Sequence, residues 1–118
     1  MPSHYPQGLV DIFLHEGLID DAIAAVDHDA AYTLVRRVAG AAVTSRPDWV
    51  VRAARRQAEA LMDGGQSMYY HAAARWLTQA RDAYRAAGRE QEWQTYLQEL
   101  LARHGRKRSL VPLLQALR

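Results

Sequence analysis

The stretch that decides the fold spans residues 69–104 and reads YYHAAARWLTQARDAYRAAGREQEWQTYLQELLARH. Its first half carries aromatic or small apolar side chains at steps of three and four residues, the period of one face of an α-helix. These residues are Tyr70, Ala73, Leu77, Ala80 and Tyr84. The second half repeats this spacing from Trp93 to His104, after a break at Gly88. The pattern predicts an antiparallel helical hairpin closed by a glycine turn.

The hairpin leaves a wide apolar face uncovered, and the rest of the chain supplies helices to cover it. We predict these helices at residues 9–15, after Asp20, from residue 29 or 30 to residue 43, at residues 48–63, and after Ser109. Asp20 and Ser109 are expected to cap the helices that they precede. Pro47 suits a first helical turn, where its missing N–H is not needed. Gly40 lies inside a predicted helix, which indicates a close helix crossing.

A faint internal repeat supports a repeated hairpin. Residues 12–17 match residues 83–88, each with an aromatic residue followed by glycine four residues later. The offset of about 71 residues is close to twice the ~34-residue period of tetratricopeptide (TPR) hairpins. The chain is therefore expected to be all-α, an irregular TPR-like α-solenoid of about three helical hairpins plus a C-terminal helix.

The length and composition of the chain limit its domain organisation and its possible sites. Its 118 residues predict one α-helical repeat domain, residues 1–118, with residues 1–7 as a flexible tail because Pro2 and Pro6 resist helix formation. The chain has no cysteine, which excludes disulfides and thiolate metal sites. We expect a cytoplasmic protein with no membrane contact, because neither a membrane span nor a signal peptide is visible.

The net charge of +2 hides an asymmetry along the chain. Residues 1–35 carry acidic side chains and no Lys or Arg, so all fifteen basic residues follow them. This separation favours contact between copies of the chain, as in a homo-oligomer, or contact with an acidic partner.

Catalytic and ligand-binding patterns are missing from the sequence. The five histidines are not paired at helical spacing, and Gly64–Gly65 lacks the Lys-Ser/Thr of a phosphate-binding loop. Asp20–Asp21 and the Asp27–Asp29 stretch suit helix N-termini better than acid–base chemistry. We therefore expect no enzymatic activity, no cofactor and no metal.

The two ends of the chain resemble the C-terminal helical region of bacterial SWIM zinc-finger family proteins. The similar segments are residues 9–17, with LVDIFLHEG, and residues 69–114, including YYH, ARDAY, GRE and RKR. In that family the region follows a zinc-binding C-x-C…C-x-H element, which this cysteine-free chain cannot supply. The resemblance implies a TPR-like interaction role, in a segment of a larger protein or a stand-alone relative, and it implies no catalytic residues.

These observations predict a non-enzymatic scaffold that binds a protein or peptide partner. By analogy with TPR stacking, the helices at residues 9–15, 30–43 and 67–87 would line a concave face. The partner-binding residues are then expected to be Tyr32, Arg36, His71, Arg75 and Trp76. Trp76 is one step off the stripe of Tyr70 and Tyr84, so it covers either a neighbouring helix or a partner.

The alternative is a nucleic-acid-binding helical domain that uses its arginine-rich faces. The phosphate contacts would then come from Arg52, Arg55, Arg56, Arg106, Lys107 and Arg108.

Overall fold

Helices make up the regular secondary structure of the computed structural model, which describes residues 5–27 and 32–118; no strand occurs in those ranges. The elements are α1 (Tyr5–His15), α2 (Ile19–Val26), α3 (Tyr32–Ala42), α4 (Pro47–Asp63), a short 3-10 helix (Ser67–Tyr69), α5 (Tyr70–Ala86), α6 (Glu90–Arg103) and α7 (Val111–Gln115). The all-α prediction is confirmed, and α4 begins at Pro47, one residue before its predicted start.

The first helix begins earlier than predicted. α1 starts at Tyr5 rather than Leu9, so the expected tail of residues 1–7 overlaps it. Pro6 is compatible with this start because the first helical turn does not use its missing N–H. The predicted start of the third helix, at residue 29 or 30, lies outside the described residues, as do residues 1–4.

Two predicted helix caps are wrong. Leu18 occupies the N-cap position of α2, and the Asp20 carboxylate instead accepts hydrogen bonds from Nε and Nη2 of Arg46, each at 2.7 Å. A two-pronged guanidinium contact is a stronger partner for a carboxylate than a backbone N–H. At α7 the N-cap position is Leu110, without a side-chain cap, so Ser109 does not perform the predicted role.

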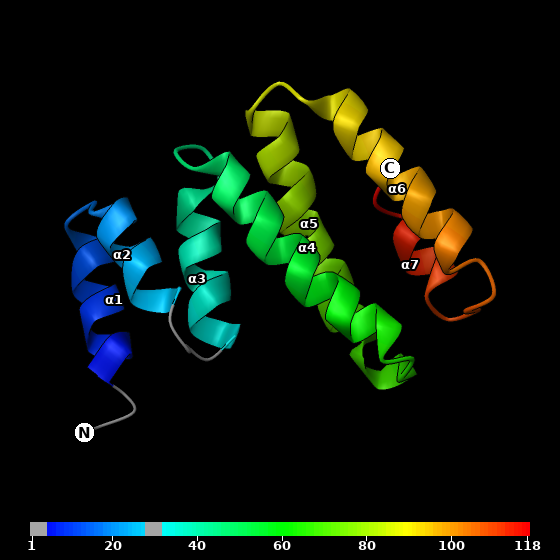
Figure 1. Ribbon diagram of the computed structural model, residues 1–118, viewed down its shortest axis with the longest axis horizontal. Coiled ribbons are helices and arrows are strands. Elements are labelled where there is room, and N and C mark those ends of the chain that lie inside the picture. The colour runs from blue at the N-terminus through cyan, green and yellow to red at the C-terminus, as the bar shows by residue number, and fades with distance from the viewer. Residues whose placement is uncertain (1–4, 28–31) are drawn as a thin grey trace.

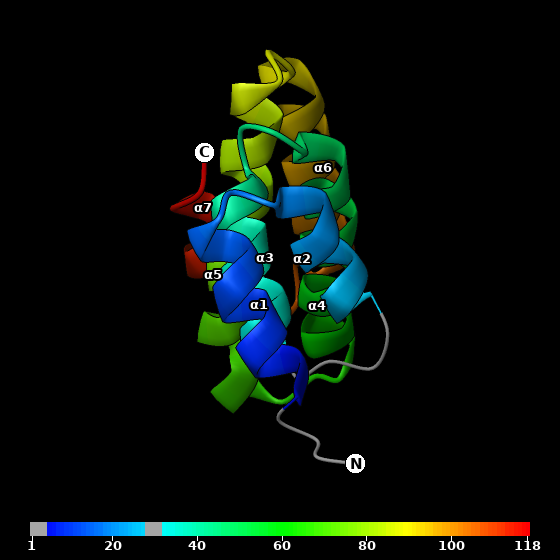
Figure 2. The ribbon, with the colours of Figure 1, turned by 90° about the vertical axis from the view of Figure 1, so that its left-hand side faces the viewer.

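The helices form two layers. In Figure 2, α1, α3, α5 and α7 lie on one side and α2, α4 and α6 on the other. Each helix contacts the next, and α1–α3, α3–α5 and α5–α7 contacts also join the odd-numbered helices, which we call the odd layer. Within the described ranges the even-numbered helices do not contact one another to a similar extent. Figure 1 shows the helices following one another across a slab of 44 × 33 × 17 Å.

The most extensive helix contact joins α4 to α5. The buried faces of both helices are rich in alanine, and these residues are Ala53, Ala54, Ala58, Ala73, Ala80 and Ala83. Small side chains let two helices approach closely, which explains why this pair is the centre of the fold. The hairpin predicted from residues 69–104 is also present as α5 and α6, with Gly88 at φ +71° in its turn.

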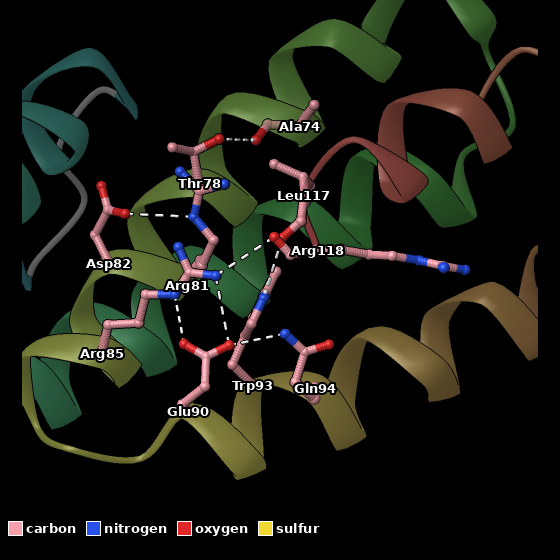
Figure 3. Close-up of polar contacts among 10 residues, drawn as sticks. All are labelled: Ala74, Thr78, Arg81, Asp82, Arg85, Glu90, Trp93, Gln94, Leu117 and Arg118. Carbon is pink, nitrogen blue, oxygen red and sulfur yellow. Dashed lines mark hydrogen bonds and ion pairs between the residues drawn. The ribbon is translucent and has the colours of Figure 1, made fainter.

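The aromatic core lies where α5, α6 and α7 meet. Trp93 is fully buried, and its ring centroid lies 6.2 Å from those of Tyr84 and Tyr96. Its indole Nε1 donates a hydrogen bond to the Leu117 carbonyl at 3.2 Å, which ties α6 to the end of α7 (Figure 3). Tyr84 and Leu97 are buried as well, as the helical spacing predicts.

His104 is buried at the end of α6, and both of its ring nitrogens lack a hydrogen-bond partner among the described residues. Burial, together with the positive charge of Lys107, holds the pKa of His104 below its ordinary value of 6.5, against the opposing charge of Asp63. The unfolded chain therefore takes up a proton near pH 6.5 before the folded chain does, and stability falls as the pH drops below this value.

We expect the free energy of unfolding to decrease between about pH 7 and about pH 5, and a His104→Leu variant to lose most of this decrease. Urea unfolding at several pH values, followed by circular dichroism, measures both. Carboxylates with lowered pKa, such as Asp20 and Glu92, act at lower pH and leave this window unaffected. Identical pH profiles for the two proteins would contradict the prediction.

Candidate partner-binding surface

A polar groove of about 380 Å³ opens on the odd layer. We call it the basic groove, and its lining consists of Thr33, Arg36, Arg37, Gly40 and Gln79. Four of these residues come from α3 and one from α5, so the groove lies along α3 with α5 as one wall. A concave surface with convergent polar groups is the usual form of a binding site.

The sequence of α3 places these residues on one face. Thr33, Arg36, Arg37 and Gly40 are spaced by three and four residues and therefore share one side of the helix. The buried side chains of α3 take the opposite side and pack into the core; they are Val35, Val38, Ala39 and Ala42. The amphipathic pattern of α3 thus directs two guanidinium groups towards solvent.

Gln79 joins the two helices at the groove. Its Nε2 donates a hydrogen bond to the Arg36 carbonyl at 3.2 Å. A Cβ atom at Gly40 would lie 3.4 Å from the same nitrogen, at van der Waals contact. Gly40 thus faces the end of the Gln79 side chain on α5, and the close helix crossing predicted there stays a prediction. The Gln79 Oε1 is buried without a hydrogen-bond partner among the described residues.

The groove carries net positive charge. Arg37 forms an ion pair with Asp11 of α1. Arg36 belongs to none of the ion pairs found within residues 5–27 and 32–118. On α5, exposed Arg75 precedes Gln79 by one helical turn, which extends the cationic wall beyond the groove.

The predicted partner-binding residues differ in where they lie and in how exposed they are. Arg36 lines the groove, and His71 and Arg75 are exposed on α5. Tyr32 begins α3, but its side chain lies outside what the structure describes. Trp76 is 1% exposed, so packing within the fold covers nearly all of its surface, as the first of its two alternatives has it.

The predicted phosphate contacts divide into exposed and internal groups. Arg52, Arg56, Arg106 and Arg108 are exposed. The Arg55 guanidinium lies 3.9 Å from the centre of the Tyr96 ring and donates a hydrogen bond to the Tyr84 hydroxyl at 3.1 Å.

Lys107 is also engaged internally. Its Nζ donates a hydrogen bond to the Met62 carbonyl at 2.7 Å, at the end of α4. Free carbonyls at a helix C-terminus are favourable partners for a cation. Two of the six predicted phosphate contacts are therefore already used within the fold.

Sequence reasoning missed most of the groove. Thr33, Arg37 and Gln79 carry no pattern that marks a site. The one usable signal was Gly40, whose position inside a helix indicates a close neighbour.

The described residues contain no cluster of three His, Asp or Glu side chains able to hold a metal ion. Among the helices described, none has the length and apolar character needed to cross a membrane. Comparisons with protein-family models, curated protein sequences and solved structures each give no match to this chain.

Proposed function

We propose that this chain is a non-enzymatic interaction module, a TPR-like α-solenoid whose odd layer binds an acidic segment of a partner protein. The observation that carries the proposal is the basic groove on the face formed by the odd-numbered helices, which contact one another in order. The resemblance to the SWIM zinc-finger family points to the same role and stays a prediction.

The alternation of the helices supports the solenoid part of the proposal. In a stacked array of helical hairpins, each unit contacts only its neighbours, and one layer packs more tightly than the other to give a curved surface. Contacts between α1 and α3, α3 and α5, and α5 and α7 follow this order. The tighter layer then forms the concave face.

Charge supports the acidic character of the partner. Arg36 and Arg75 present guanidinium groups on this face, and a guanidinium pairs with carboxylates through two parallel hydrogen bonds. An extended segment that carries Asp and Glu would satisfy both groups, and encounter would be faster at low salt.

We expect a fluorescein-labelled peptide rich in Asp and Glu to bind the full chain at about 50 mM salt. An Arg36→Glu variant should bind it at least about tenfold more weakly, because it reverses the charge inside the groove. Arg52→Glu is the matched control, since it makes the same charge change on an exposed position of α4 and should alter affinity less than about twofold. Fluorescence anisotropy measures both.

A peptide with Gln and Asn in place of the acids tests charge recognition itself. Equal binding of the two peptides, or equal effects of the two variants, would contradict the proposal. The nucleic-acid alternative rests on the exposed positions Arg52, Arg56, Arg106 and Arg108. Salt-sensitive binding of a labelled oligonucleotide that Arg52→Glu weakens and Arg36→Glu leaves unchanged would favour it.

A further inference from the structure

A second hollow lies between α4 and α5, near the turn that joins them. This apolar pocket has a volume of about 190 Å³ and is lined by Gln57, Leu61, Tyr69, Ala72 and Trp76. Gln57 and Leu61 are one turn apart on α4, and Ala72 and Trp76 are one turn apart on α5. In Figure 1, α3 and α4 diverge towards this end of the α4–α5 pair.

The walls of the pocket suit an apolar occupant. The half-buried Leu61 and the almost fully buried Trp76, which is 1% exposed, make the lining apolar, and the side chain of Ala72 is small. At the adjoining 3-10 helix, Met68 is 75% exposed and Tyr69 is 47% exposed. Large apolar side chains that gather at the surface beside a hollow mark an interaction site.

The volume of the pocket limits the size of the side chain that can enter it. A cavity of about 150 Å³ lined by apolar side chains holds one benzene molecule. The pocket of about 190 Å³ therefore accommodates one phenylalanine or leucine side chain and is too small for two.

The charges near the pocket favour an acidic partner segment as the carrier of this side chain. The lining has no acidic residue, and exposed Arg75 lies on α5 one helical turn before Gln79 of the basic groove. Ala72, Trp76 and Gln79 follow one side of α5, so the pocket and the basic groove lie along the same helix edge. Trp76 and Gln79 are separated by roughly 5 Å along the axis, a distance that about two residues of an extended chain span.

We propose that the apolar pocket is an anchor site for one bulky apolar side chain of the partner, located about two residues from the acidic side chains that enter the basic groove. The proposal rests on the proposed function and specifies its ligand. The groove supplies charge recognition, and the pocket supplies selection by size and apolar character.

The test uses two acidic peptides that differ at one position, about two residues from their acidic run, with Phe in one and Ala in the other. We expect the full chain to bind the Phe peptide at least about tenfold more tightly, because the ring leaves water. Ala72→Leu fills the pocket and should reduce this ratio to near one while the Ala peptide keeps its affinity. Ala86→Leu, at an exposed position of α5, is the matched control and should preserve the ratio.

Circular dichroism establishes that both variants are folded, and Leu61→Gln gives a second way to remove apolar surface should Ala72→Leu unfold. Equal affinity of the wild-type chain for the two peptides would overturn the anchor site and leave the proposed function standing. Binding of neither peptide would overturn both. A ratio that survives in Ala72→Leu and in Leu61→Gln would place the selection elsewhere and would also overturn the anchor site.

Discussion

Replacing Trp93 by alanine is expected to lower the free energy of unfolding by about 3–5 kcal/mol. The side chain is fully buried and contacts the rings of Tyr84 and Tyr96, so its removal leaves a large cavity at the junction of three helices. It also removes the hydrogen bond to the Leu117 carbonyl, which holds the end of α7 in place. Urea unfolding followed by circular dichroism at the helix band measures the loss.

Trp49→Ala is the matched control for this prediction. Trp49 is only partly buried, and its Nε1 donates a hydrogen bond to the exposed carboxylate of Asp27 at 3.0 Å. Its truncation removes less buried area and should cost clearly less stability than that of Trp93. Trp93→Phe keeps most of the packing but leaves the Leu117 carbonyl without its donor, which should cost about 1–3 kcal/mol. Equal losses for Trp49→Ala and Trp93→Ala would contradict this account of the core.

The sequence predicts the core well because helical spacing is a local property. The steps from Tyr84 to Trp93 and Leu97 depend only on the pitch of two helices and on the Gly88 turn between them, and all three side chains are buried. The start of α4 at Pro47 could be predicted as well, because a proline in the first helical turn is also a local signal. The extensive contact between α4 and α5 is harder to predict from the sequence, because alanine is common in helices whether or not they approach closely.

Polar contacts between distant segments could not be predicted. Asp20 has the chemistry of a helix cap, yet it pairs with Arg46, which the fold brings to the same end of the molecule. Arg55 and Lys107 read as free cations, yet one stacks on Tyr96 and the other closes the end of α4. A sequence gives the capacity of a side chain to pair and not the identity of its partner.

The candidate site likewise contains residues that the sequence could predict and residues that it could not. Arg36 follows from the analogy with TPR stacking, which places its helix on the concave face. Gln79 could not be found in this way, because its role depends on the packing of α5 against α3. Trp76 lies one step off the stripe of Tyr70 and Tyr84 and is buried as well, because α5 packs against helices on more than one side.

The alanine-rich contact between α4 and α5 leads to the second large effect, that of replacing Ala58 by leucine. Ala58 is fully buried near the middle of α4, in the most extensive helix contact of the fold. Three added carbon atoms have no space there, so the two helices must separate or the side chain must adopt a strained rotamer. Overpacking of this kind costs about 1–3 kcal/mol and occasionally more.

The control for Ala58→Leu is Ala60→Leu, the same substitution two residues along the same helix at an exposed position. Leucine and alanine differ little in helix propensity, so Ala60→Leu should change stability by less than about 0.5 kcal/mol. Urea unfolding of the two variants thus isolates the packing of α4 against α5 from the stability of α4 itself. Equal stability of the two variants would show that the helices tolerate a wider separation, and the central role of their alanine contact would have to be abandoned. A clear loss in Ala58→Leu alone would instead show that the close approach of α4 and α5, on which the apolar pocket between them depends, is a requirement of the fold.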